Sequence, residues 1–273
     1  MQLSFIVQGK SYSIDTQQGV SLASGLDFNG PQINHFGVPA AKATTIEMGG
    51  FVGDTARGGS CNVKTLEIIP HCHGTHTESV SHIVDELIKP SDCVSSLIPA
   101  RLISVTPVSP NDSEDSYEPE LTETDRIIDK KTLELALGDT PCEWCEALLI
   151  RTLPNDSEKL SRHYSSEQEP PFFTHEAMAF INEKGVQHLL VDFPSLDRQY
   201  DEGKLSNHRL YWSVDSSEHN LSEATQSLKT VTELIFVKDE IDDGVYVLNL
   251  QLIDFEVDAV PSRPLLYPVS SID

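Results

Sequence analysis

Unbroken apolar runs along the chain predict buried β-strands. The runs at 146–151 and 187–193 carry Leu, Ile or Val at successive positions, a pattern typical of strands that are covered on both faces. Two more strand patterns lie near the end of the chain, at 232–238 and 244–255, and an acidic turn separates them. Strands are therefore expected along much of the chain.

Two segments have the apolar periodicity and the end signals of helices. The first covers about 129–137 and ends at a glycine. The second covers 175–184, where Thr174 can cap its start and Gly185 can stop it. Residues 1–10 predict a first strand that turns at a glycine. Because strands outnumber helices and the two are interspersed, the order predicts an α/β fold without a doubly wound nucleotide-binding arrangement.

Polar stretches interrupt this pattern, and each predicts an exposed insertion in a single domain that spans residues 1–273. They are dense in Ser, Asp, Glu, Asn or Pro and lie near 108–126, 153–171 and 215–229. The Gly-rich stretch 30–62 differs from them, because its interspersed Phe, Val and Ile predict ordered loops near a site.

Charge and composition narrow the classes of partner. The 43 acidic residues outnumber the 19 basic ones, and the resulting formal charge of -24 would repel nucleic-acid phosphates and anionic membrane surfaces. We therefore expect neither nucleic acid nor membrane as a partner. No segment approaches the roughly 20 apolar residues that span a bilayer, and residues 1–10 lack a signal-peptide pattern. The odd number of cysteines, five, suggests no secreted disulfide framework, so a cytoplasmic location is predicted.

The densest chemistry lies at 71–82, a run that contains four of the ten histidines together with Cys72 and Glu78. A strand pattern at 64–69 leads into it. Thiolate, imidazole and carboxylate are the groups that hold zinc and similar divalent ions. The run therefore predicts a metal centre.

The choice of ligands within this run depends on its backbone conformation. If the segment is extended, alternation places Cys72, His76 and Glu78 on one face, and His82 arrives from the next turn. His71 then points to the other face, although it stays open as a ligand in place of Cys72. Bound Zn²⁺ can lower the pKa of its water from about 15.7 to roughly 7. Such a donor set suits hydrolysis by an activated water and needs no organic cofactor.

The same run resembles the signature of the cyclase family of metal-dependent hydrolases, which includes bacterial kynurenine formamidase. That signature reads His-x-Gly-Thr-His-x-Asp-x-Pro-x-His. The positions that match it in register are Gly74, Thr75, His76 and His82. Cys72, Glu78 and Val80 replace its first histidine, its aspartate and its proline.

Weaker likenesses follow in the family's order. They are the strand ending at 151–152, the segment 185–197, the histidine of 207–209 and the glutamate of 231–234. The resemblance implies that His82 is the general acid/base. It also implies a set of metal ligands in which Glu78 is shared by two ion positions: Cys72, His76, Glu78, His208 and Glu233.

The resemblance implies a swivelling β/β/α fold, in which helices flank a mixed or antiparallel sheet. It implies hydrolysis of a C–N amide bond in a small molecule, with an aryl formamide such as N-formylkynurenine, from tryptophan catabolism to kynurenine, as the expected substrate. A homodimer or homotetramer is expected. The sulfur of Cys72 favours zinc, as one or two ions. The alternatives are a hydrolase of cyclic amides or lactones and, because three signature positions are altered, a non-catalytic metal-binding or interaction protein.

Overall fold

β-Strands dominate the computed structural model, which describes residues 1–138, 142–166 and 168–272. Its main sheet contains β3 (Val20–Ser21), β8 (His76–Glu78), β9 (Ile98–Val105), β11 (Ala147–Thr152), β13 (His188–Val191), β14 (Thr230–Glu233), β15 (Gly244–Leu252) and β16 (Ala259–Pro268). The strand order is β15-β9-β11-β13-β14-β8-β16-β3, and β15 also pairs with β16. That additional pairing closes seven of the strands into a barrel, with β3 added to β16.

The barrel is mixed, as expected, but its closure changes the predicted class. The strands β9, β11, β13 and β14 run parallel, whereas β8, β15 and β16 pair antiparallel with their neighbours. Closure removes the free edges that an open sheet would leave unpaired. The fold is therefore mainly β with few helices, and the expectation of an α/β sheet flanked by helices is corrected. Local apolar patterns do not encode the pairing of β15 with β16.

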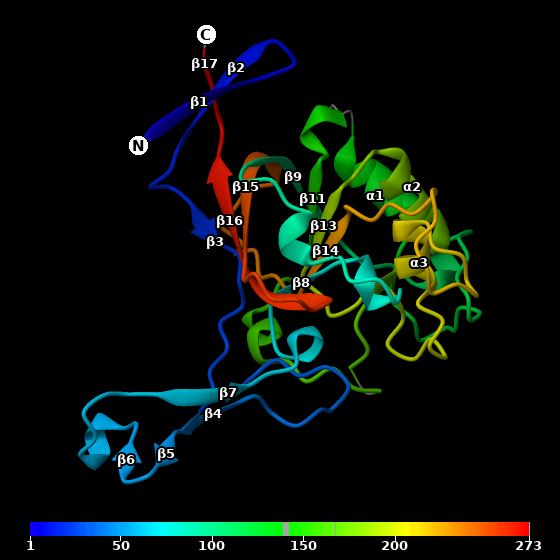
Figure 1. The fold of residues 1–273 in the computed structure, drawn as a ribbon. Coiled ribbons are helices and arrows are strands. Elements are labelled where there is room, and N and C mark those ends of the chain that lie inside the picture. Colours follow the sequence, from blue (N-terminus) through cyan, green and yellow to red (C-terminus); the bar gives the residue numbers. More distant parts are fainter. Residues whose placement is uncertain (139–141, 167, 273) are drawn as a thin grey trace.

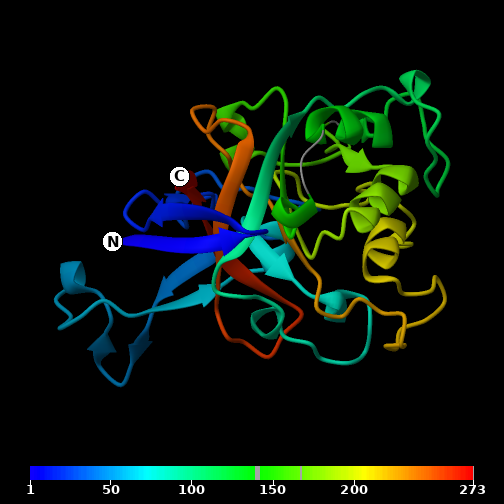
Figure 2. The same ribbon diagram turned by 90° about the horizontal axis from the view of Figure 1, so that it is seen from above.

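The α-helices of the described segments lie together on one side of the barrel (Figures 1 and 2). They are α1 (Lys130–Leu137), α2 (His175–Glu183) and α3 (Ser206–Trp212). Asp129 caps α1 and Thr174 caps α2, because each side chain accepts a hydrogen bond from a backbone N–H of the first turn. The two helices predicted from the sequence thus form, and α3 is an additional helix.

Alternation along β11 explains why its apolar run is unbroken. Leu148 and Ile150 join a core cluster shared with α1 and α2, whereas Leu149 joins a second cluster formed by β9, β13, β15 and β16. One face of the strand therefore packs under the helices and the other packs inside the barrel. Burial of both faces requires apolar residues at successive positions.

The strand expected at 232–238 corresponds to β14. It covers Thr230–Glu233, so it is shorter than predicted and both begins and ends earlier. Leu234 adopts a left-handed backbone with a φ of 57°, which breaks the ladder. Ile235 and Val237 continue the apolar run because they fill the barrel core rather than a strand.

Smaller elements surround the barrel. One three-stranded sheet contains β1 (Gln2–Val7), β2 (Lys10–Asp15) and β17 (Ser270–Ile272). Two-stranded pairs are β10 (Ile127–Ile128) with β12 (Phe172–Phe173), β4 (Lys42–Thr45) with β7 (Lys64–Glu67), and β5 (Glu47–Met48) with β6 (Phe51–Val52). The 3₁₀ helices are η1 (Thr55–Arg57), η2 (Pro70–Cys72), η3 (Val80–His82), η4 (Pro90–Asp92), η5 (Pro110–Asp112), η6 (Cys142–Trp144) and η7 (Ser157–Ser161).

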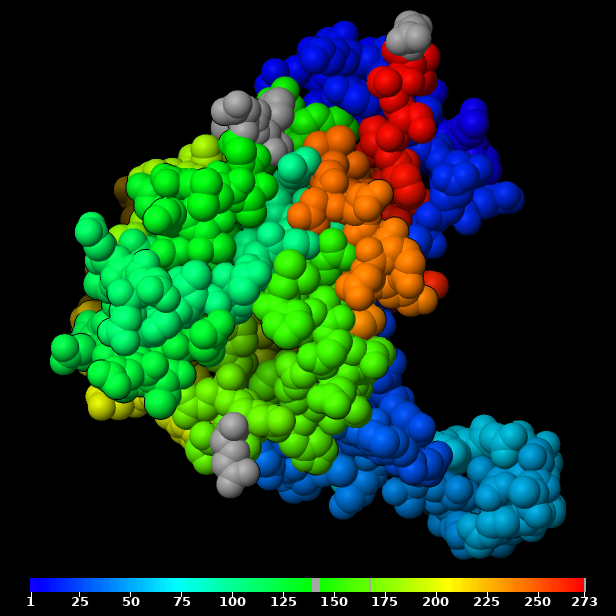
Figure 3. All heavy atoms as spheres, turned by 180° about the vertical axis from the view of Figure 1, so that it is seen from behind, coloured from blue at the N-terminus to red at the C-terminus, as the bar shows by residue number. Residues whose placement is uncertain are grey.

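The pairs β4–β7 and β5–β6 form an arm that projects from the body of the molecule (Figures 1 and 3). Much of the Gly-rich stretch, expected as loops near a site, is therefore a strand ribbon whose tip points away from the barrel. No helix of the described segments is long and apolar enough to cross a membrane.

Lys159, in the polar stretch 153–171, is buried and anchors that stretch to the barrel. The Lys159 ammonium lies 2.8 Å from an Asp192 carboxylate oxygen and donates to the Thr152 carbonyl at 2.7 Å. The side chain of Lys159 is 6% exposed and that of Asp192 is fully buried. The ion pair thus fixes the stretch to the ends of β11 and β13.

We expect Lys159→Met to destabilise the protein by about 3–5 kcal/mol, because it leaves a buried carboxylate without its counter-ion. Urea unfolding would measure this change. The exposed Lys131→Met, as a matched control, should change stability by less than about 0.5 kcal/mol. Equal stability of the two variants would show that Asp192 does not need its partner.

Candidate metal centre

The register of two barrel strands, β8 and β14, places an imidazole and two carboxylates together. β8 lies between β14 and β16, and His76 is directly opposite Glu233 across the β8–β14 pair. His76 Nε2 lies 3.3 Å from Glu233 Oε2. Glu78 is two residues along β8 and therefore shares the face of His76. The intervening Thr77 points to the other face, where its hydroxyl lies 2.8 Å from that of Thr232.

The Gly-Thr pair before β8 holds the end of β14 in place. The Thr75 hydroxyl donates to the carbonyl of Leu234 at 2.6 Å. Gly74 has a φ of +124°, and a Cβ there would lie 3.3 Å from the Ser24 hydroxyl, so a side chain would be strained and crowded. The Gly74 carbonyl contacts His76 Nδ1 at 3.0 Å. The pair therefore orients both His76 and the strand that carries Glu233.

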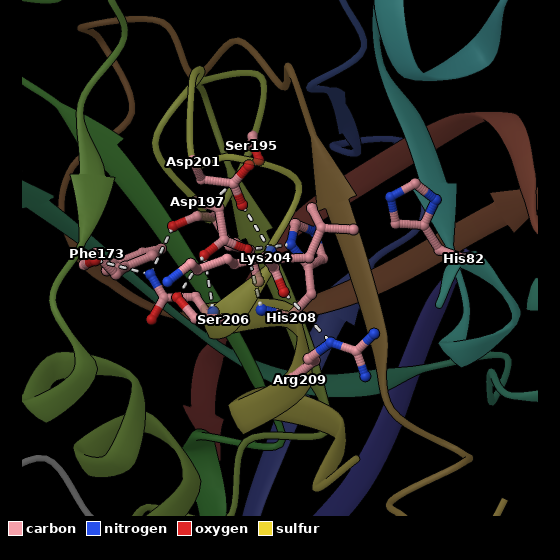
Figure 4. A network of polar contacts seen from close by, with 12 residues as sticks. His82, Phe173, Ser195, Asp197, Asp201, Lys204, Ser206, His208 and Arg209 are labelled. Carbon is pink, nitrogen blue, oxygen red and sulfur yellow. Dashed lines mark hydrogen bonds and ion pairs between the residues drawn. The ribbon is translucent and has the colours of Figure 1, made fainter. Parts of the chain in front are cut away.

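α3 supplies the second buried imidazole. His208 Nδ1 lies 2.6 Å from Asp197 Oδ2, and Nε2 lies 3.0 Å from Glu78 Oε1 and 3.7 Å from Glu233 Oε1. Asp197 is itself held by hydrogen bonds from the Tyr117 hydroxyl and the Asn207 backbone. Figure 4 shows Asp197 beside His208 within this network. The ring is therefore fixed with Nε2 toward the carboxylates.

Two further imidazoles and an aspartate lie at the rim of this cluster. His82, on η3, has its Nδ1 3.9 Å from Glu78 Oε2 and 3.4 Å from Asp258 Oδ2. His71, on η2, has its Nδ1 3.1 Å from Glu78 Oε2 and its Nε2 2.9 Å from Asp258 Oδ2. Figure 4 shows His82 coming from a different segment than His208. Asp258 was not predicted, because only the pairing of Ala259 with Glu78 brings it here.

The run before β8 is not extended, so the predicted alternation across it is wrong. Residues Pro70–Cys72 form the 3₁₀ helix η2, and only His76–Glu78 form a strand. As a result His71 faces Glu78, whereas Cys72 is buried and belongs to none of the ligand groups described below. His73 is held locally, because its Nδ1 accepts from the Ile69 backbone N–H and its Nε2 contacts the Pro39 carbonyl.

The ionisable groups of the cluster shift one another's pKa. Burial opposes ionisation of Glu78, but the imidazoles of His82 and His208 hold its pKa well below the usual range. Burial likewise opposes protonation of His208, but the Glu78 charge and the hydrogen bond to Asp197 raise its pKa well above the usual value. Burial, followed by the Glu233 charge, raises the pKa of the Cys72 thiol to about 11.

The imidazole nitrogens and carboxylate oxygens of the cluster are suitable ligands for a divalent cation. Within the described residues, the buried atoms that make no hydrogen bond include His76 Nε2, both carboxylate oxygens of Glu78 and Glu233 Oε1, although each lies 3.0–3.7 Å from a facing imidazole or carboxylate. Such atoms are rare unless they serve an ion or another function. Three groups have ligand atoms that all lie within 4.8 Å of one another: His71, His76 and Glu78; Glu78, His82 and His208; His71, His82 and Asp258. Imidazole nitrogen and carboxylate oxygen are suitable ligands for zinc and related ions.

The structure thus brings together most of the residues proposed from the sequence. His76, Glu78, His208 and Glu233 form the buried part, and His82 lies beside them. Neither Cys72 nor Glu233 belongs to the three ligand groups, and His71 belongs to two of them. The histidine density of the run signalled His71, but no sequence signal marked Asp258.

Two curated kynurenine formamidases are similar to this chain in sequence. A kynurenine formamidase of Bacillus cereus is 27% identical over 217 residues, which cover 77% of this chain and 82% of that protein. A kynurenine formamidase of Bacillus cytotoxicus is 29% identical over 152 residues, which cover 53% of this chain and 62% of that protein.

Solved structures share the fold. A "predicted metal-dependent hydrolase" from Bacillus stearothermophilus matches with a TM-score of 0.56 at 18% identity, covering 91% of this chain and 97% of that one. An isatin hydrolase bound to the product analogue thioisatinate matches with a TM-score of 0.60 at 15% identity, covering 92% of each chain. The family model Cyclase, described as "Putative cyclase", matches residues 13–198, which is more than half of the chain. The chain therefore belongs to the Cyclase family.

Proposed function

We propose that this protein is a metal-dependent hydrolase that cleaves a C–N amide bond, with an aryl formamide as its substrate. The observation that carries the proposal is a buried cluster whose potential ligand atoms include several that make no hydrogen bond. Its members are His76, His208, Glu78 and Glu233. The similarity to kynurenine formamidases supports the choice of a formamide, such as N-formylkynurenine. Zinc is the proposed ion because imidazole and carboxylate ligands suit it.

Each residue of the cluster has a distinct task in this proposal. His76, His208, Glu78 and Glu233 would hold a divalent ion through their nitrogen and oxygen atoms, and the two carboxylates would balance its charge. The bound ion would supply Lewis-acid activation of water and of the amide carbonyl. His82 has a quarter of its side chain exposed and touches Asp258, so it can reach water and substrate and pass a proton to the departing amine.

A cyclic amide is the second candidate substrate. The fold match to an isatin hydrolase favours it, because isatin contains a five-membered ring amide that water can open. A lactone would open by the same attack on a carbonyl. The non-catalytic alternative, a metal-binding or interaction protein, would keep the ligands without turnover.

Metal analysis combined with substrate assays tests these functions. The purified full-length chain should contain at least one equivalent of zinc and should hydrolyse N-formylkynurenine. Hydrolysis of isatin alone would select the cyclic-amide function. Stoichiometric metal without turnover of any amide or lactone would identify a binding protein, and the absence of bound metal after zinc addition would contradict the proposal as a whole.

We further propose a cytoplasmic homodimer or homotetramer. The arm supports self-association, since it projects from the body and exposes Met48 and Leu66, which are 76% and 57% exposed. Light scattering on the purified chain would measure its mass, and a monomer at micromolar concentration would contradict this proposal.

Metal binding should release protons, and affinity should rise with pH. Against the effect of burial, the Glu78 charge and the Asp197 hydrogen bond raise the pKa of His208, which favours its protonated form in the metal-free protein. Its Nε2 must lose that proton to bind a cation, whereas Glu78 is already ionised and takes up none. Calorimetric titration with zinc in buffers of different ionisation enthalpy should show the release of roughly one proton or more. Binding heats independent of the buffer would contradict the prediction.

A further inference from the structure

We infer that His71 completes the metal centre in place of Cys72, and that Asp258 orients the His71 ring. The inference rests on the proposed metal-dependent function and specifies its ligands. It departs from the family signature, in which the position of Cys72 carries a histidine. Its basis is a geometry that three imidazoles of the cluster share.

In each of these imidazoles, one ring nitrogen contacts an oxygen atom that is not a proposed ligand. The other ring nitrogen lies beside the carboxylate of Glu78 or Glu233. In His208, Nδ1 contacts Asp197 and Nε2 faces Glu78. In His76, Nδ1 contacts the Gly74 carbonyl and Nε2 faces Glu233. Metal-binding histidines almost always have their second nitrogen held in this way, which fixes the ring and the tautomer.

His71 repeats this pattern. Its Nε2 lies 2.9 Å from Asp258 Oδ2, and its Nδ1 lies 3.1 Å from Glu78 Oε2. Its ring centre is 5.1 Å from that of His76. Nδ1 therefore lies beside the same carboxylate that His208 approaches at the opposite oxygen, as a third nitrogen ligand would.

The backbone explains why the ligand has moved by one residue. Pro70 begins η2, where its fixed φ suits the first position of a helical turn. The turn replaces the extended conformation, and from it the His71 ring lies beside Glu78 and Asp258. Cys72 then packs in the interior, only 5% exposed, and its carbonyl accepts from the His35 backbone N–H at 3.3 Å.

The exchange changes the chemistry of the site. With His71 the proposed ligands are nitrogen and oxygen only, so the preference for zinc that a thiolate would impose is removed. Manganese, cobalt and zinc should then all bind. Asp258 Oδ2 contacts both His71 and His82, so the same carboxylate that orients a ligand also holds the proposed proton carrier.

Cobalt spectroscopy of the full-length chain tests the inference. Metal-free wild-type protein would be titrated with Co²⁺, and its absorption spectrum should show cobalt d–d bands without an intense near-ultraviolet thiolate charge-transfer band. Cys72→Ala should leave the spectrum unchanged and the Co²⁺ affinity within about threefold. His71→Ala should weaken binding by more than about 100-fold, and Asp258→Asn by about 10–100-fold. His73→Ala, a nearby histidine outside the cluster, is the matched control and should bind normally.

The outcomes separate this inference from the proposed function. A strong charge-transfer band in the wild type that disappears in Cys72→Ala would overturn the assignment of His71 and leave the metal-dependent function standing. Failure of the wild type to bind either Co²⁺ or Zn²⁺ would overturn both. The wild-type spectrum decides between sulfur and nitrogen even if a variant fails to fold.

Discussion

Replacing His82 with alanine should lower turnover by about 10²–10⁴-fold, the contribution of a positioned acid/base. His82 lies at the rim of the cluster, 3.9 Å from Glu78 and 3.4 Å from Asp258, and it is partly exposed. It is thus placed to protonate the departing amine, whereas His76 and His208 are buried and directed at carboxylates. The loss should appear mainly in kcat, because the variant keeps the other groups that bind substrate.

Metal content separates this role from a structural one. His82→Ala should retain the zinc stoichiometry of the wild type, and its thermal unfolding should be similar. His163→Ala, which removes an exposed histidine from a polar stretch, should keep full activity as the matched control. Full activity of His82→Ala would remove this residue from the reaction, and loss of metal would identify it as a ligand instead.

Replacing Glu78 with glutamine should abolish metal binding and lower activity by at least about 10³-fold, since the bound ion supplies several kcal/mol of transition-state stabilisation. Glu78 is fully buried, and its two oxygens face His208 on one side and His71 on the other. Glutamine keeps the shape of the side chain but removes the charge. The cluster would then keep only the Glu233 carboxylate to balance the charge of a cation.

A stability measurement gives a second readout for Glu78. Zinc at about 100 times its dissociation constant should stabilise the wild type by about 2.7 kcal/mol, because the ion binds only the folded chain. Glu78→Gln should show no such gain, whereas Glu67→Gln, on the exposed strand β7, should behave as the wild type. Equal stabilisation of Glu78→Gln by zinc would show that this carboxylate is not a ligand.

Some of the site could be predicted from short-range information and some could not. The spacing of His76, Glu78 and His82 marked the centre, because strand alternation and the following turn act over a few residues. Family likeness, not spacing, suggested His208 and Glu233, which reach β8 through α3 and β14. The extended conformation expected before β8 was wrong, because Pro70 begins a 3₁₀ turn there, and the choice between His71 and Cys72 as a ligand stays a prediction.

The same division applies to the fold. Apolar runs and capping residues in the chain were sufficient for β11, β13, α1 and α2, because burial on both faces and local hydrogen bonds specify each of them separately. Closure of the barrel, by contrast, depends on the pairing of β15 with β9 and β16. Asp258 reaches the site for the same reason, as β16 pairs with β8. These contacts join residues far apart in the chain, and their free energy comes from packing that exists only once the strands have assembled.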